Sequence, residues 1–302
     1  MKTPIFTGAC VAIVTPFTEN GINFDKLGEL IERQIAGGTD AICICGTTGE
    51  ASTQTIEEHK AAIEYCVKKV DHRVKVIAGT GSNCTRTALD LSLYAESCGA
   101  DGLLIVTPYY NKATQAGLIQ HYTYIADRVH TPIIMYNVPS RTGTKFTAET
   151  YYELSKHPMI NGIKEASGDF GLATHTLQLC GDNINIWSGN DDQVVPLMSL
   201  GAKGVISVVS NVKPELMVEM THLCLEGKFA EAAQLQVSTI GLVDALFVEV
   251  NPIPVKVALN MIGLNVGNLR MPLCDMSEAH KEVLCKALLS AGLDVKNPAA
   301  KA

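Results

Sequence analysis

The chain has 302 residues, of which 47% are hydrophobic and 18% are charged, and its net charge is −7 at neutral pH. This balance is typical of a folded globular protein and excludes a disordered chain. Without clustered Lys and Arg we expect no binding to nucleic acid, and without an apolar stretch of roughly 20 residues we expect no contact with a membrane.

The ten cysteines are scattered along the chain, and no two of them are spaced C-x-x-C. This pattern favours small buried thiols in a reducing compartment over disulfides or a metal site. The first residues lack a charged leader and a small-residue cleavage site, so we expect no signal peptide. Together these features predict a cytoplasmic protein.

Eight short apolar runs follow one another along the chain. Their hydrophobic residues are continuous rather than alternating, which is typical of strands buried on both faces. We therefore expect strands within residues 8–17, 40–50, 74–81, 101–110, 132–139, 160–167, 184–191 and 204–211.

Amphipathic stretches separate these runs, and they predict helices at residues 25–37, 55–70, 85–98, 115–129, 147–156 and 169–180. Strands that alternate with helices predict a parallel sheet with right-handed crossovers. Eight such units favour a closed (β/α)8 TIM barrel over an open sheet.

After the eighth run the pattern becomes helical, with predicted helices at residues 214–225, 229–249, 254–261 and 277–289. A barrel needs only one helix after its last strand, so the chain has more helices here than the barrel requires. The sequence thus predicts an α/β fold with a catalytic barrel over residues 1–225 and a small C-terminal helical domain over residues 226–302.

The active site of a TIM barrel lies where its strands end. The predicted strand ends read G-T-T-G-E (46–50), T-P-Y-Y-N (107–111), Y-N-V-P-S-R-T-G (136–143), I-K-E-A-S (163–167) and S-G-N-D-D (188–192). They hold hydroxyls, phenols, one Arg and one Lys, but no His and no cluster of carboxylates. Since metal-ligand, G-x-G-x-x-G and Walker A motifs are missing as well, we expect no metal, nucleotide or flavin cofactor.

Lys164 stands out because it lies inside a predicted strand, on the same face as Gly162. If that face points into the barrel, Gly162 leaves space below the amine, and lost hydration favours a neutral lysine. A neutral amine is the nucleophile that forms an imine with a ketone. Position alone leaves open an ammonium that pairs with Glu165 or reaches solvent. Lys256 is a second candidate, but its N-P-I-P context favours a structural role.

Tyr136 shares one face of the neighbouring predicted strand with Ile134. A phenol beside an amine can transfer protons during imine formation, although a core tyrosine bonded to a carbonyl is the alternative. Arg141 follows in the next loop, where its guanidinium suits bidentate binding of a carboxylate. A solvated loop arginine is the alternative there.

Thr47 and Thr48 lie between glycines, so exposed backbone N–H groups and two hydroxyls could bind a carboxylate and relay a proton. Taken alone, G-T-T-G is only a turn. Tyr109 and Tyr110 leave a similar choice between surface phenols and a lid over the site.

These five motifs occur together and in order on successive predicted strands. In this combination the chain resembles the dihydrodipicolinate synthase / N-acetylneuraminate lyase family of class I aldolases, from about Gly8 to the C-terminal helices. N-P-I-P-V-K at residues 251–256 also fits the C-terminal domain of that family. The combination is specific, whereas each motif alone is weak.

The resemblance implies a mechanism in which pyruvate forms a Schiff base on Lys164 and condenses with L-aspartate-4-semialdehyde, on the diaminopimelate route to lysine. It further implies that Tyr136, Thr47 and Tyr110 relay protons, with Tyr110 reaching into the site of a neighbouring subunit. A homotetramer built from two tight dimers is the implied assembly.

The resemblance also assigns binding roles. Arg141 is expected to bind the carboxylate of the semialdehyde. Three positions match residues near bound pyruvate: Thr48, Gly189 and Ile206. Lysine-sensitive members have a feedback site between subunits, and four matching positions are compatible with it: Ser52, His59, Asn83 and Tyr109. However, Ile56 replaces a histidine and Thr87 replaces a glutamate of those enzymes, so we predict weak or absent inhibition by lysine.

Two alternatives remain. An aldolase of the same family could act on N-acetylneuraminate or a keto-deoxy sugar acid, but sialic-acid lyases lack Arg141 and carry Ser-Thr where this chain has Thr47 and Thr48. A barrel without catalysis that only binds a ligand is the second alternative. The intact set of Lys164, Tyr136, Thr47 and Tyr110 argues against it, because a pure binding protein has no need for all four.

Overall fold

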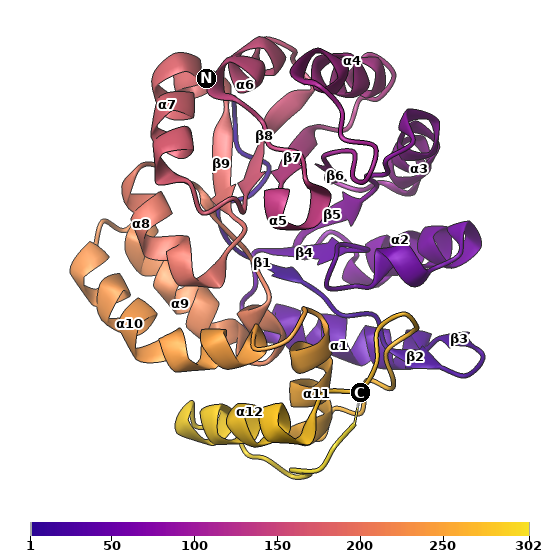
Figure 1. Cartoon of the computed structure of the whole chain (residues 1–302), viewed down its shortest axis with the longest axis vertical. Helices are drawn as coiled ribbons and strands as arrows, with labels where there is room; N and C mark the ends of the chain where they lie inside the picture. Colours follow the sequence, from indigo (N-terminus) through magenta and orange to yellow (C-terminus); the bar gives the residue numbers. More distant parts are fainter. Residues whose placement is uncertain (1, 302) are drawn as a thin grey trace.

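The computed structural model describes residues 2–301. Eight parallel strands close into a barrel in the order β1-β10-β9-β8-β7-β6-β5-β4 (Figure 1). The strands are β1 Gly8–Ala12, β4 Ala41–Ile44, β5 Lys75–Gly79, β6 Gly102–Val106, β7 Ile133–Asn137, β8 Ile160–Glu165, β9 Asn185–Ser188 and β10 Gly204–Ser207. Each lies within its predicted run, so the prediction of a (β/α)8 barrel is confirmed.

All ten predicted helices are present. They are α1 Phe24–Ala36, α2 Ile56–Val70, α3 Thr85–Cys98, α4 Gln115–Ala126, α6 Ala148–Ser155, α7 Phe170–Cys180, α9 Pro214–Leu225, α10 Phe229–Leu246, α11 Ile253–Met261 and α12 Glu278–Ser290. The predicted ends of α4 and α10 were three residues too late. Val129 explains the first error, because it is buried without being helical and so extends the apolar pattern.

Several short elements were missed by the prediction. They are the hairpin of β2 Phe17–Thr18 and β3 Gly21–Ile22, the helices α5 Pro139–Thr142 and α8 Val194–Ser199, and four 3-10 turns: Ala51–Thr53, Gly181–Asn183, Asp191–Gln193 and Val209–Asn211. Elements of two to six residues are too short to show a periodicity, which explains why the sequence did not reveal them.

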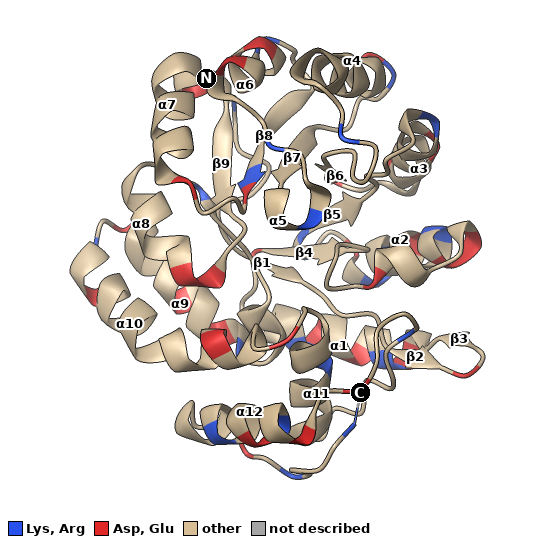
Figure 2. Ribbon diagram, viewed as in Figure 1, with Lys and Arg blue, Asp and Glu red and all other residues tan. Residues whose placement is uncertain are grey.

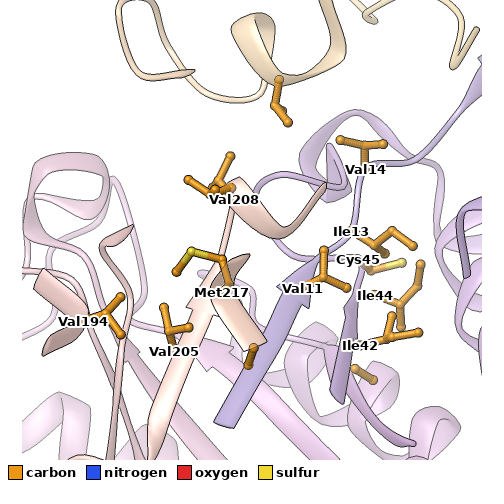
Figure 3. Packing of buried hydrophobic residues seen from close by; sticks show 14 of the residues in the cluster. Val11, Ile13, Val14, Ile42, Ile44, Cys45, Val194, Val205, Val208 and Met217 are labelled. Atoms are coloured by element: carbon orange, nitrogen blue, oxygen red, sulfur yellow. The ribbon is translucent and has the colours of Figure 1, made fainter. Parts of the chain in front are cut away.

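Two layers of apolar side chains hold the barrel together. The outer layer packs the strands against the surrounding helices, and Figure 3 shows part of it, with Val11 on β1, Ile42 and Ile44 on β4, and Met217 on α9. The inner layer fills the barrel, and it consists of Phe6, Cys10, Ala12, Ala41, Cys43, Ile77, Leu104, Ile134, Tyr136, Val138, Trp187 and Ile206. Strands buried on both faces require this double layer, which is why their apolar runs are continuous.

Trp187 occupies the space that Gly162 leaves free. A Cβ atom at Gly162 would lie 2.5 Å from Cζ3 of Trp187. The indole stacks on Phe6 with ring centroids 5.0 Å apart, and its Nε1 donates to the Phe6 carbonyl at 3.2 Å. The predicted space below Lys164 is therefore filled by an aromatic ring rather than left open.

The C-terminal helices α10 to α12 lie on one side of the barrel (Figure 1). A buried ion pair connects α11 to the loop after β4, because Nζ of Lys256 donates to Oε1 of Glu50 at 2.8 Å and both side chains are fully buried. Nζ of Lys256 also donates to the Asn268 carbonyl at 2.7 Å. The boundary predicted near residue 225 stays a prediction.

Charged residues lie mostly on the helices and loops around the barrel, whereas β8 carries two of them in its own sequence (Figure 2). Among residues 2–301, no helix combines the length and the apolar character that crossing a bilayer requires.

Candidate active site

Lys164 lies near the carboxyl end of β8 and is only 6% exposed. Its register partners are Tyr136 on β7 and Trp187 on β9, and its Nζ lies 4.4 Å from the centre of the Tyr136 ring. In the described part of the chain, no hydrogen bond or ion pair engages this ammonium. The amine is thus held inside the barrel by packing, which leaves its nitrogen available for reaction.

Glu165 does not pair with Lys164. Its carboxylate accepts hydrogen bonds from Nδ2 of Asn137 at 3.0 and 3.1 Å, from the Tyr151 hydroxyl at 3.3 Å and from the backbone N–H of Ser167 at 2.8 Å. Consecutive residues of a strand point to opposite faces, so Glu165 points away from the barrel interior. Burial raises the pKa of Glu165, against the lowering effect of these hydrogen bonds.

Lys256 is not equivalent to Lys164. Burial lowers the pKa of Lys256, although its partner Glu50 opposes this effect. Two acceptors hold its ammonium, whereas no hydrogen bond holds that of Lys164 among residues 2–301. Its position agrees with the structural role that the N-P-I-P context indicated.

A cavity of about 400 Å³ opens beside Tyr136. Its lining includes Thr47 from the loop after β4 and Arg141 from α5, so the structure brings these three predicted residues together. No hydrogen bond joins the hydroxyls of Tyr136 and Thr47 within residues 2–301. The volume is in the range of sites for small ligands.

Arg141 is the only charged side chain among the described residues that line this cavity. His59 also lines it, but burial lowers the pKa of this imidazole, which keeps it neutral at pH 7. The lining holds no carboxylate. A cavity with one cation and no anion favours ligands that carry a negative charge.

Tyr110 does not line the cavity of its own chain. Its side chain is 91% exposed, and its backbone adopts a left-handed conformation with φ of 70°. Non-glycine residues seldom adopt this conformation. The structure of one chain therefore does not bring Tyr110 to Tyr136 and Thr47.

Gly189 lies close to Lys164, and Ile206 lies in the interior of the barrel. A Cβ atom at Gly189 would lie 2.7 Å from Cβ of Ala166 and 3.2 Å from Cε of Lys164, so any other residue would crowd the lysine. Ile206 lies on β10, is 1% exposed and belongs to the inner layer. Gly189 thus adjoins Lys164, and Ile206 shares the barrel interior with Tyr136.

Thr48 is buried, and its hydroxyl oxygen accepts a hydrogen bond from Nδ2 of Asn251 at 3.0 Å. The backbone carbonyl of the same asparagine accepts from Nη2 of Arg141 at 3.2 Å. Asn251 was not among the predicted site residues. The dipeptide Asn251–Pro252 signals a turn, but nothing in the sequence indicates which loop that turn contacts.

All but one of the positions that match a feedback site lie on the same cavity. Ser52, Ile56, His59, Thr87 and Tyr109 all line it. Asn83 is not part of the lining, and its carbonyl accepts from Nδ2 of Asn111 at 3.2 Å.

Comparison with known proteins places the chain in a family. The model of the Dihydrodipicolinate synthetase family matches residues 5–291. A 4-hydroxy-tetrahydrodipicolinate synthase of a Thermoanaerobacter species is 55% identical over 291 residues, which cover 96% of this chain and 98% of the relative. The enzyme of that name from Acetivibrio thermocellus is 52% identical over 293 residues, or 97% of this chain and 100% of the relative.

Solved structures agree with this result. Dihydrodipicolinate synthase from Aquifex aeolicus superposes with a TM-score of 0.95 at 43% identity, covering 97% of this chain and 100% of that one. The enzyme from Acinetobacter baumannii, solved in complex with pyruvate, has a TM-score of 0.93 at 42% identity and covers 95% and 99%. The chain belongs to the Dihydrodipicolinate synthetase family.

Proposed function

We propose that the protein is a 4-hydroxy-tetrahydrodipicolinate synthase, a lyase that condenses pyruvate with L-aspartate-4-semialdehyde on the diaminopimelate route to lysine. The observation that carries this proposal is Lys164, a buried amine at the carboxyl end of β8 that is packed on the ring of Tyr136 and has no ionic partner among residues 2–301. The named synthases that resemble the chain over nearly its whole length support the choice of substrates.

In the proposed mechanism, Nζ of Lys164 attacks the ketone carbon of pyruvate, and the resulting carbinolamine loses water to form an imine. Loss of a methyl proton converts the imine to an enamine. The enamine carbon attacks the aldehyde carbon of the semialdehyde, whose oxygen takes up a proton. The amino group of the semialdehyde then attacks the imine carbon, which closes the ring and releases Lys164 as a free amine.

The other residues have supporting roles in this proposal. Tyr136 and Thr47 transfer protons from the cavity side of the imine. Thr48, Gly189 and Ile206 surround the pyruvate, and Arg141 binds the carboxylate of the semialdehyde. No metal or organic cofactor is needed, because the protonated imine itself accepts the electrons of the breaking C–H bond.

We propose that the working form is a homotetramer in which Tyr110 completes the relay of a neighbouring subunit. The 91% exposure of Tyr110 supports this, because the residue finds no place in the site of its own chain. We place the enzyme in the cytoplasm, since its ten cysteines are free thiols, as is usual in a reducing compartment.

The experiment that tests the activity compares substrates. We expect consumption of pyruvate together with L-aspartate-4-semialdehyde, and no release of pyruvate from N-acetylneuraminate or a keto-deoxy sugar acid. Pyruvate release from either sugar acid at a comparable kcat/KM would favour the aldolase alternative. Absence of any reaction with all substrates would favour the non-catalytic alternative.

Removing Arg141 should affect one substrate only. We expect Arg141→Leu to raise KM for the semialdehyde about 10- to 100-fold, since a hydrogen bond to a charged group contributes about 1.5–3 kcal/mol. The pyruvate adduct on Lys164 should still form. The matched control is Arg86→Leu, which removes an exposed arginine paired with Asp90 on α3. An unchanged KM for the semialdehyde in Arg141→Leu would assign that carboxylate to another residue.

Lysine should inhibit weakly, because the cavity that holds Ile56 and Thr87 offers no carboxylate to an ammonium group. We expect an inhibition constant above 1 mM, which corresponds to a binding free energy weaker than about −4 kcal/mol. The double substitution Ile56→His with Thr87→Glu should strengthen the inhibition. A sub-millimolar constant for the unaltered protein in steady-state assays would refute this prediction.

A further inference from the structure

Asn251 connects Thr48, which the proposed function places beside pyruvate, with Arg141, which it assigns to the carboxylate of the semialdehyde. Its side-chain Nδ2 donates to the Thr48 hydroxyl oxygen at 3.0 Å, while its backbone carbonyl accepts from Nη2 of Arg141 at 3.2 Å. The residue is 5% exposed and lies in the segment between α10 and α11. A single residue of the C-terminal region thus contacts both sides of the site.

The direction of the first hydrogen bond determines where the Thr48 proton points. A hydroxyl has one proton to donate and two lone pairs to accept with. Because the Thr48 oxygen already accepts from Asn251, the proton of this hydroxyl can be donated to another acceptor. The carboxylate of bound pyruvate is such an acceptor, because it carries no proton at neutral pH.

The other half of the Asn251 amide has no structural role of its own. Its Oδ1 is buried and has no hydrogen-bond partner within residues 2–301. An unpaired buried acceptor reduces stability, so an apolar side chain would serve the fold better at this position. The presence of an asparagine at position 251 is therefore explained by its Nδ2 donor, which orients the Thr48 hydroxyl.

The segment that carries Asn251 is held firmly against the loop after β4. Lys256, on the following helix α11, donates to the carboxylate of Glu50, two residues beyond Thr48. The backbone N–H of Arg270 donates to the same carboxylate at 3.0 Å. These contacts fix the position of the segment relative to the loop, and therefore the distance between Asn251 and Thr48.

We propose that Asn251 is a positioning residue for pyruvate: its amide turns the Thr48 hydroxyl towards the pyruvate carboxylate, while its backbone carbonyl holds Arg141 at a set distance from that position. This inference rests on the proposed function. It predicts different effects on the two substrates, because the side chain of Asn251 acts on pyruvate binding and its backbone carbonyl acts on semialdehyde binding.

The test uses Asn251→Ala and Asn251→Asp in the full chain. Pyruvate is titrated against each variant, the imine is trapped with borohydride, and the adduct is quantified by intact mass. We expect the half-saturating pyruvate concentration to rise about tenfold in Asn251→Ala, the effect of one hydrogen bond to a charged network. Asn251→Asp should have a larger effect, since its carboxylate accepts the Thr48 proton and repels the pyruvate carboxylate.

KM for the semialdehyde should change by less than about twofold in Asn251→Ala, because the backbone carbonyl that holds Arg141 remains. Equal increases for both substrates would mean that the turn has loosened as a whole, which overturns the inference. Should the alanine variant fail to fold, the nearly isosteric Asn251→Asp decides by the same measurement.

A double-mutant cycle with Thr48→Val gives the decisive readout. If Asn251 acts through the Thr48 hydroxyl, Asn251→Ala should add little once that hydroxyl is gone. Additive effects would overturn the inference. The matched control is Asn260→Ala, which removes a buried asparagine of α11 whose amide donates to the carbonyls of Gly267 and Lys301. This control should lower the thermal stability without changing the pyruvate concentration needed for trapping.

Failure of the proposed function is distinguishable from failure of this inference. If the unaltered protein forms no pyruvate adduct, the proposed function is wrong and the role of Asn251 falls with it. If the unaltered protein forms the adduct and Asn251→Ala forms it at the same pyruvate concentration, only the inference about Asn251 is wrong.

Discussion

Lys164→Ala is expected to abolish the pyruvate adduct and to lower turnover by more than about 10³-fold, because among residues 2–301 the other buried lysines are held in ion pairs. Lys164 is the interior lysine whose ammonium has no partner among residues 2–301, and Nζ lies 4.4 Å from the centre of the Tyr136 ring. Without the imine, pyruvate has no group that stabilises the carbanion, and the carbon–carbon bond cannot form at a useful rate.

The measurement is borohydride trapping with pyruvate, followed by peptide mass mapping. In the unaltered protein the adduct should map to Lys164. The control is Lys286→Ala, which removes an exposed lysine of α12 and should leave both the adduct and the turnover unchanged. An adduct on Lys256, or normal turnover by Lys164→Ala, would refute the proposed mechanism.

Of the substitutions proposed for this protein, Lys256→Met should produce the largest loss of unfolding free energy. The substitution leaves the Glu50 carboxylate buried without its cation, and breaking a buried ion pair in this way costs about 3–5 kcal/mol of unfolding free energy. The side chains of both residues are fully buried, so water cannot compensate for the lost partner. Denaturation in urea with linear extrapolation measures the change.

Two comparisons make this prediction specific. Adding Glu50→Gln to Lys256→Met should restore part of the stability, because it removes the unpaired charge. Lys68→Met breaks an exposed pair with Glu64 on α2, where the side chains are 74% and 42% exposed, and should cost less than about 1 kcal/mol. If Lys256→Met were as mild as Lys68→Met, the buried pair would not be what fastens α11 to the barrel.

The fold was predictable because its signals are local and repeat. Each strand is buried on both faces and therefore appears as a continuous apolar run, and each long helix shows its own amphipathic spacing. Thr55 is an example, since the predicted helix starts at this residue, and in the structure Thr55 caps α2 and forms reciprocal hydrogen bonds with Glu58. The short helices α5 and α8 lack such a signal, although α5 carries Arg141.

The site was predictable in part, for a related reason. Residues at the carboxyl ends of parallel strands of a barrel must meet at one end of it, so motifs after β4, β7, β8 and β9 indicated a common site. Alternation along a strand also put Lys164 on the face of Gly162 and Tyr136 on that of Ile134, and in the structure these faces point into the barrel. These inferences need only the order of the strands and the period of two.

Contacts between segments far apart in the chain were decided by the tertiary structure alone. The register of β8 and β9 pairs Gly162 with Asn185 and Lys164 with Trp187, so that the indole reaches the space at Gly162 diagonally. No pattern in either segment encodes that register. Asn251 meets Thr48 across 203 positions of sequence, and Lys256 meets Glu50 across 206. The sequence by itself determined the barrel, since local periodicity carries it, and the combination of family motifs indicated Lys164 as the candidate reactive lysine. Which distant side chains orient and anchor that site depends on packing in three dimensions, which local periodicity does not record.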